Sequence, residues 1–255
     1  MKKRIVLPLL ALLLCLAGCA SIESSIMFNR IDRVKYSVFT YRSQVSYSLS
    51  VTGTGYSFHR EGSESADVID RLTRRSEVKA QVTDDGSTRS YTAYELDGYY
   101  YFNEESGKYR YKSSDAELEE LKKTLYEKYE RAVFLSDQIE VLDSGMTKIT
   151  LTLDANLIAD DVDPVLQNYL VFMNFSLQSA RLQSFVYSVT IAEDYHVMQE
   201  SCQGTARLTL VDGQVLDLRY DFTEDFSDFN DIITIHFPDD LDTYVDLEEY
   251  RAGVE

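Results

Sequence analysis

Cysteine is the residue type in this chain whose placement indicates a chemical role most clearly. The chain has three cysteines, Cys15, Cys19 and Cys202. Cys19 follows Leu16-Ala17-Gly18, at the end of a segment that begins with three basic residues, Lys2, Lys3 and Arg4, and continues as an uncharged apolar run. That run is too short to cross a hydrocarbon core comfortably as a helix, which takes ~20 residues. The basic start, the apolar run and the small residues at its end indicate a secretory signal.

The four residues Leu16-Ala17-Gly18-Cys19 resemble the lipobox of bacterial lipoproteins. This resemblance implies that the chain is cut after Gly18 and that Cys19 is diacylated on its sulfur, with palmitate as an acyl chain. Two acyl chains are sufficient for stable membrane anchoring. The resemblance therefore implies a protein held by lipid on the extracytoplasmic side of the cell membrane. The alternative is an ordinary signal peptide that contains a cysteine by chance.

The charge of the chain excludes several classes of partner. The formal net charge is −18 at pH 7, and removal of the basic signal segment makes it more negative. Nucleic-acid binding depends on basic patches that neutralise phosphate, so we expect no nucleic-acid partner. The acidic surface also repels anionic headgroups, so we expect membrane contact through the acyl chains of Cys19.

The remaining candidates for catalysis or metal binding are few. Cys202 is the one cysteine left for the body of the chain, so no disulfide is expected within it, and we interpret Cys202 as a small buried hydrophobe. The three histidines, His59, His196 and His236, fit no metal-binding spacing, and no nucleophile or phosphate-loop motif is visible. We therefore expect no catalytic residues, no metal and no cofactor.

Acidic residues cluster in the second half of the chain. One group, expected in a loop, consists of Asp221, Glu224, Asp225, Asp228 and Asp231. Calcium takes 6 to 8 oxygen ligands, so such a group could hold a cation, but no run fits a calcium-binding loop. We interpret these groups as solvated loops.

The pattern of apolar residues predicts mainly β-structure. Val45, Tyr47, Leu49 and Val51 alternate with serines, and this period of two indicates a strand with one buried face. The dipeptides Asp85-Gly86, Asp97-Gly98 and Asp212-Gly213 separate strand-like runs and predict type I′ hairpins. Further strands are expected around residues 78–82, 88–96, 99–103, 108–112, 149–153, 185–191, 196–211 and 215–222, with a bulge or bend at Gly204.

Three segments are expected to be helical. Residues 20–35 carry apolar side chains at helical spacing, Ser114 to Ala132 begins with a capping box, and a third segment begins at Asp163-Pro164. No composition shift marks a domain boundary, so we expect one α+β domain with an antiparallel sheet.

The order of these elements resembles the LolA/LolB-like half-barrel of lipoprotein carriers, and the chain looks like Tyr-rich lipoproteins of Gram-positive bacteria. The segments that carry the resemblance are Asp97-Gly98-Tyr99-Tyr100-Tyr101, Lys108-Tyr109-Arg110-Tyr111 and Phe226-Ser227-Asp228-Phe229-Asn230. It implies a curved antiparallel sheet with two to three helices on its concave face. The implied domains are a signal peptide at 1–18, a lipidated tether at 19–24 and a single half-barrel at 25–255.

That fold would leave a pocket between the helices and the sheet. The chain has 19 tyrosines and 12 phenylalanines, and aromatic walls suit a hydrophobic or amphipathic ligand such as a lipid or a lipid-linked molecule. The pocket candidates are Tyr47, Leu49, Tyr99, Tyr101, Leu151, Tyr169, Tyr187, Val189, Leu218 and Tyr220. The alternative function is a protein-interaction or assembly module at the cell surface that binds no small ligand.

Overall fold

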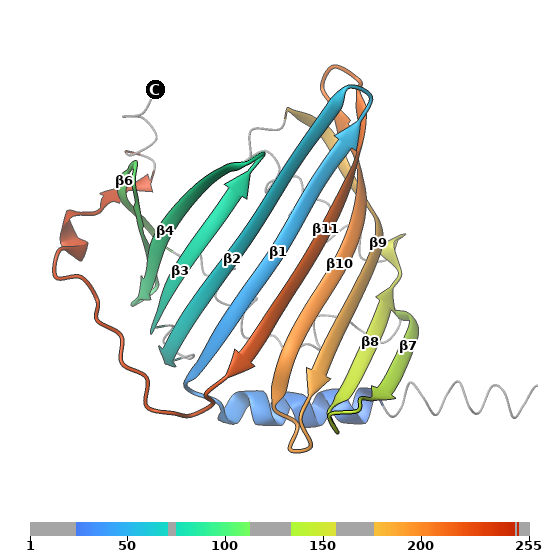
Figure 1. Ribbon diagram of the computed structural model, residues 1–255, viewed down its shortest axis with the longest axis vertical. Helices are drawn as coiled ribbons and strands as arrows, with labels where there is room; N and C mark the ends of the chain where they lie inside the picture. The colour runs from blue at the N-terminus through green and yellow to red at the C-terminus, as the bar shows by residue number, and fades with distance from the viewer. Residues whose placement is uncertain (1–23, 71–74, 113–133, 157–175, 248, 250–255) are drawn as a thin grey trace, which may run out of the picture.

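One large open sheet of 12 strands forms the frame of the molecule (Figure 1). The computed structural model describes residues 24–70, 75–112, 134–156, 176–247 and 249. The strands are β1 (Tyr41–Gly53), β2 (Tyr56–Asp70), β3 (Arg75–Asp84), β4 (Ser87–Leu96), β5 (Tyr99–Glu104), β6 (Gly107–Lys112), β7 (Phe134–Val141), β8 (Thr147–Leu153), β9 (Leu177–Ile191), β10 (Val197–Leu210), β11 (Val215–Ser227) and β12 (Val245–Asp246).

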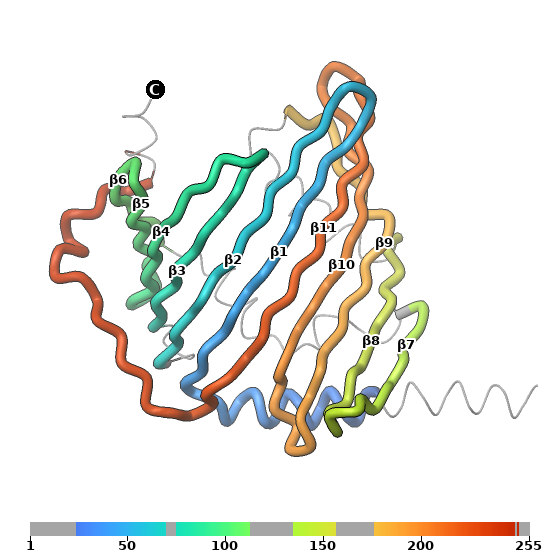
Figure 2. Tube along the Cα trace, viewed as in Figure 1, coloured from blue at the N-terminus to red at the C-terminus, as the bar shows by residue number. Residues whose placement is uncertain are grey.

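The sheet is built from two antiparallel meanders that meet in its middle (Figure 2). Strands β1 to β6 follow one another across one half, and strands β7 to β11 follow one another across the other. The two halves are joined where β1 pairs with β11, with Leu49 opposite Tyr220. The short β12 pairs with β6 in parallel, and every other pair is antiparallel. The expected large antiparallel sheet is therefore confirmed, and it is open.

Two of the three predicted type I′ hairpin turns are confirmed. Asp85 and Gly86 have φ values of 44° and 88°, and Asp97 and Gly98 have 52° and 80°, as the two central residues of a type I′ turn require. At the third turn only Gly213 has a positive φ, and its N–H donates to the Leu210 carbonyl at 2.9 Å. This loop is longer, since Leu210 also donates to the Gln214 carbonyl at 2.8 Å, so the type I′ prediction was wrong here.

Alternation along the strands gives the sheet two chemically different faces. On β1, Leu49 and Val51 are buried while Ser46 is exposed, as the alternating pattern predicted. We call the face that carries Leu49 the inner face and the opposite one the outer face. Residues that pair directly across neighbouring strands share a face, so the register assigns every strand residue to one of them.

Two apolar clusters occupy the inner face. The first lies on β8, β9 and β10 and includes Ile149, Leu151, Leu153, Tyr187, Val189, Ile191 and Val197. The second lies on β1, β9, β10 and β11 and includes Leu49, Val51, Ala180, Ala206, Leu208, Leu216 and Leu218. Their side chains are at most 7% exposed, so they form the core of the described part of the chain.

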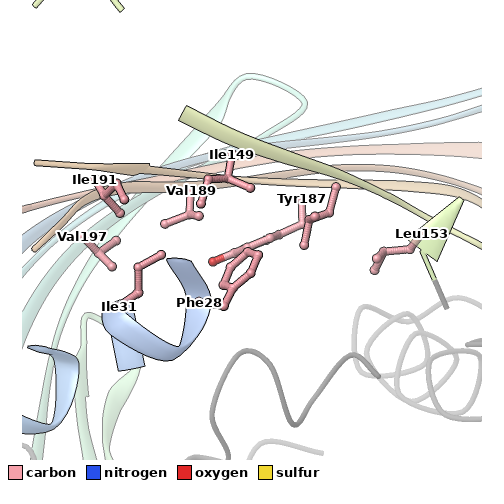
Figure 3. Close-up of a cluster of buried hydrophobic side chains, with 9 residues drawn as sticks. Phe28, Ile31, Ile149, Leu153, Tyr187, Val189, Ile191 and Val197 are labelled. Carbon is pink, nitrogen blue, oxygen red and sulfur yellow. The ribbon is translucent and has the colours of Figure 1, made fainter. Parts of the chain in front are cut away.

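A helix over residues 24–37 packs on the first of these clusters. Phe28 and Ile31 point from the helix towards the inner face of the sheet, as Figure 3 shows. Polar contacts fix both ends of the helix. Ser24 near its start donates to Asp137 on β7, and Lys35 near its end lies 2.6 Å from Glu200 on β10.

The helix count is lower than expected in the described part of the chain. The helix at 24–37 confirms the first of the three predicted segments. The segment from Ser114 to Ala132 and the one that begins at Asp163 lie outside the described residues, as do the signal segment and Cys19. No helix among the described residues has the length and apolar character needed to cross a membrane.

After β11 the chain crosses to the far edge of the first meander (Figure 1). We call residues 228–246 the C-terminal strap. Phe237 of the strap lies against Tyr94 of β4, and Tyr244 makes an edge contact with Tyr101 of β5. Lys108 on β6 lies 2.6 Å from Asp240, so the strap is held by both apolar and ionic contacts on the outer face.

Candidate functional site

Most of the predicted pocket residues share the inner face of the sheet. They are Tyr47 and Leu49 on β1, Leu151 on β8, Tyr187 and Val189 on β9, and Leu218 and Tyr220 on β11. Leu151, Tyr187 and Val189 belong to the cluster under the helix, whereas Leu49 and Leu218 belong to the other cluster. These five side chains are buried, so they build the core beneath any surface that a ligand could reach.

Two predicted pocket residues lie on the opposite face. Tyr101 pairs with Tyr94 and Arg110, and Tyr99 lies two residues before it on β5, so both point to the outer face. Tyr101 is covered by Tyr244 of the C-terminal strap. They therefore share no surface with Tyr47 or Tyr220. Tyr169 lies outside the described residues.

The neighbouring rings on β4, β5 and β6 form an aromatic ladder on the inner face. Its members are Tyr91, Tyr100, Phe102, Tyr109 and Tyr111, and all five are half-buried. Phe102 stacks on Tyr109 with ring centroids 5.1 Å apart, and Tyr100 stacks on Tyr111 at 5.0 Å. The ladder is a partly accessible aromatic surface at one end of the sheet.

A row of carboxylates crosses the same face beside the ladder. Register places Glu200 of β10 opposite Glu224 of β11, and Glu224 opposite Val45 of β1, whose other partner is Glu64 of β2. The line continues through Ala80 and Tyr91 to Glu104 of β5. We call Glu200, Glu224, Glu64 and Glu104 the carboxylate row.

Tyrosine hydroxyls connect the ladder to the row. Tyr91 donates to Glu64 at 3.2 Å, and Tyr109 donates to Glu104 at 2.8 Å. The ring of Tyr47 lies over Gly62, next to Glu64 on β2, where a Cβ would collide with it. Gly62 is therefore the position that lets the Tyr47 ring lie flat against the sheet.

Burial governs the ionisation of this site. It raises the pKa of Glu64, and the hydrogen bond from Tyr91 acts in the opposite direction. It also raises the pKa of Glu224; among the other causes, the Ser43 hydrogen bond and Lys35 lower it, while Glu200 and Glu64 raise it. Burial and the nearby Glu64 charge raise the pKa of Tyr91, so its hydroxyl stays protonated and remains a donor.

The arrangement suits binding of a molecule with an apolar part and a polar part. Aromatic rings present apolar area and accept stacking against flat or aliphatic groups. The carboxylate row next to them provides hydrogen-bond acceptors, and a carboxyl with a raised pKa also donates once it is protonated. Lys35 is the cation that lies on this row among the described residues.

The other candidate chemical groups are poor nucleophiles or ligands. Burial, with Asp221 and Glu200 nearby, raises the pKa of the Cys202 thiol to about 11, so the thiol stays protonated. In the described ranges, no three His, Cys, Asp or Glu side chains are placed to hold a metal ion. The acidic group expected in a loop instead begins on β11, where Glu224 faces inward while Asp221 and Asp225 face outward.

None of the ladder rings is among the pocket candidates predicted from the sequence, and Glu224, the one member of the carboxylate row named there, was interpreted as part of a solvated loop. Tyr100 and Phe102 were hidden because Tyr99, Tyr100, Tyr101 and Phe102 form an unbroken aromatic run with no alternation to show a face. A signal was available next to it, since Ala93 on β4 pairs with Phe102 and sets the inner face of β5.

The sequence matches no model of a known protein family and no curated protein. Among solved structures it is similar to LprF from Mycobacterium bovis, at 11% identity and a TM-score of 0.42, with 85% of this chain and 97% of that chain covered. It is also similar to lipovitellin, from a structure of lipid–protein interactions, at 9% identity and a TM-score of 0.35. This match covers 78% of this chain and 26% of that chain. A third similar structure is a DUF1329 family protein from Desulfovibrio piger, at 8% identity and a TM-score of 0.27. This match covers 83% of this chain and 94% of that chain. All three TM-scores are below 0.5, so these similarities do not indicate a function for this chain.

Proposed function

We propose that this chain is a membrane-anchored lipoprotein that binds a hydrophobic or amphipathic molecule, such as a lipid or a lipid-linked molecule, on the inner face of its sheet. The observation that carries the proposal is the aromatic ladder, five half-buried rings on the face that also carries the apolar core. Aromatic surface that stays partly accessible beside a core is typical of a ligand site.

The carboxylate row supports an amphipathic ligand in particular. The hydrogen bonds from Tyr91 to Glu64 and from Tyr109 to Glu104 place polar groups at the margin of the ladder. A ligand with its apolar part on the rings would present its head to these carboxylates. Anchoring is proposed from Leu16-Ala17-Gly18-Cys19, which would hold this face near its source of lipid.

Ligand binding is tested with the mature chain carrying Cys19→Ser, so that no acyl group is attached. Native mass spectrometry checks for co-purified lipid, and a fluorescent monoacylglycerol, whose head is uncharged, measures binding. Phe102→Ala and Tyr109→Ala should weaken binding of the monoacylglycerol by about tenfold, since each removes a ring from the ladder. Phe39→Ala is the matched control, because Phe39 is 50% exposed and lies outside the ladder.

The same measurements can also contradict ligand binding on the inner face. A mature chain without co-purified lipid, whose binding of the monoacylglycerol is unchanged by Phe102→Ala and Tyr109→Ala, would exclude the ladder as a lipid site. Recovery of one stoichiometric protein partner by crosslinking would then favour the protein-interaction module. Anchoring is tested separately: Cys19→Ala should release the folded protein from membranes, and unchanged retention would contradict the lipobox interpretation.

A further inference from the structure

The outer face carries a hollow that the inner-face site does not explain. It has a volume of about 710 Å³ and extends over β1 to β5. Its walls are outward-pointing side chains from all five strands: Gln44, Ser63, Ser65, Lys79, Gln81, Ser90, Thr92 and Asn103. Glu64, Ala80, Tyr91 and Glu104, which lie between them on the same strands and face inward, also line it. We call this site the outer hollow.

The register shows that the outer hollow is two residues wide and runs across the strands. Gln44, Ser65, Lys79, Thr92 and Asn103 form one transverse line of directly paired residues. Ser63, Gln81 and Ser90 form part of the next line. Strands β1 to β4 lie side by side in Figure 1, so the hollow crosses them at a steep angle to their direction.

Most of the side chains that form the walls of the outer hollow are polar and uncharged, although the protein as a whole is strongly acidic. Seven of the wall residues offer hydroxyl or amide groups, namely Gln44, Ser63, Ser65, Gln81, Ser90, Thr92 and Asn103. The net charge of the chain is −18, yet among the described residues the charged side chains at the outer walls and end of the hollow are Lys79 and Glu105; Glu64 and Glu104 also line it, but their side chains point to the inner face. Amides and hydroxyls both donate and accept hydrogen bonds, which matches a neutral ligand rich in hydroxyl groups.

An aromatic group borders this polar surface. Tyr94 lies two residues along β4 from Thr92 on the same face, and Phe237 of the C-terminal strap lies 6.0 Å from it between ring centroids. Both rings are half-buried, so part of their surface is accessible. A flat aromatic surface beside a line of amides and hydroxyls can stack on the apolar face of a sugar ring.

We propose that the outer hollow binds a neutral polysaccharide strand that lies across β1 to β5. Gln44, Gln81 and Asn103 would hydrogen-bond to its hydroxyl or acetamido groups, with one sugar ring against Tyr94. Polyanionic polysaccharides are disfavoured by the acidic protein around the site. The proposal concerns the face opposite the ladder and does not rest on ligand binding there.

The test uses two soluble probes, tetra-N-acetyl-chitotetraose and cellotetraose, with the mature chain carrying Cys19→Ser. Chemical-shift changes in a ¹⁵N-labelled sample should map to the outer hollow with at least one probe at millimolar concentration. Gln81→Ala and Asn103→Ala should each weaken binding about fivefold, as loss of one hydrogen bond predicts. Gln203→Ala is the matched control, because Gln203 is exposed on the same face of β10, away from the hollow.

A blocking variant provides a second measurement. Ser90→Arg places a long side chain in the hollow at an exposed position, so it should abolish binding and leave the fold unchanged. Three outcomes would overturn the proposal: no shifts with either probe, shifts that map to Phe102 and Tyr109, or equal losses in Gln81→Ala and Gln203→Ala. Each is distinct from failure of monoacylglycerol binding, which concerns the inner face.

Discussion

The half-buried glutamates Glu64 and Glu224 make the stability of the protein depend on pH. The folded state raises the pKa of Glu224 above its ordinary value, mainly through burial. A carboxyl with a raised pKa binds its proton more tightly in the folded protein than in the unfolded chain. Its protonated form therefore favours folding, and this contribution is present below the ordinary pKa and is lost as the pH rises through the folded pKa. The pKa of Glu64 is also raised by burial, so its contribution to stability depends on pH in the same direction.

Glu224→Gln should therefore stabilise the protein at neutral pH. Glutamine keeps an oxygen that can accept the Ser43 hydrogen bond but carries no charge to bury. We expect a higher urea midpoint than in the parent at pH 7, with a difference that shrinks as the pH falls towards the ordinary pKa of glutamate. Asp217→Asn on the same strand is the control, because Asp217 is exposed and should give little change. A stabilisation that does not depend on pH would contradict the assignment.

At single residues, the sequence predicted faces well where polar and apolar side chains alternate. Tyr47 and Leu49 were placed correctly with Tyr220, because serines separate them and leave one consistent face. Tyr99 and Tyr101 were placed on the wrong face because every position from 99 to 102 is aromatic. Such a run has no internal period, so its face is set by the pairing of β5 with β4, where Ala93 lies opposite Phe102.

At the scale of elements, the strands that the sequence missed are polar or irregular. β2, Tyr56–Asp70, reads YSFHREGSESADVID, and its inward positions include Gly62, Glu64 and Ala66 in place of large apolar side chains. It becomes a central strand because β1 and β3 pair with it on both sides. β7 was also missed, since Ser136 to Gln138 carries no alternating apolar pattern. Tertiary pairing overrides weak local propensity in both cases.

The helix at 24–37 provides the sharpest test of packing by one element. Ile31 is 0% exposed against the first cluster, whereas Ile26 on the same helix is 50% exposed. Ile31→Ala should lower the free energy of unfolding by about 2 to 5 kcal/mol, as expected for a buried large-to-small change. Ile26→Ala makes the same chemical change at the surface and should cost roughly 0.5 kcal/mol or less.

Equilibrium urea unfolding of the two variants measures both free energies of unfolding. Similar losses for Ile31→Ala and Ile26→Ala would show that the helix does not pack on Ile149 and Val189 as described. The Lys35–Glu200 contact at 2.6 Å should remain in both variants, so any difference reports on apolar packing.

At the scale of the whole molecule, the large negative net charge destabilises the compact folded state. A net charge of −18 produces self-repulsion in the folded state, and dissolved salt screens it. The screening length falls from about 30 Å at 0.01 M salt to about 8 Å at 0.15 M. We expect the thermal midpoint to rise over this range. Replacing the exposed Asp239 and Asp242 of the C-terminal strap by Asn should make the rise smaller, and an unchanged salt response would argue against a global charge effect.

The pairing of β1 with β11 has a consequence for the order in which the protein can be completed. Ribosomes synthesise a chain from its N-terminus, so β1 emerges early and its partner on one side emerges last among the long strands. The first meander can form as it is made, because each strand pairs with the one before it. Until β11 is available, the backbone N–H and C=O groups on one edge of β1 have no strand partner. Unpaired strand edges of this kind can pair with the wrong strand or with another chain. Closure of the β1–β11 seam is thus the slow, long-range step expected in folding, and the nascent protein depends most on protection before that step.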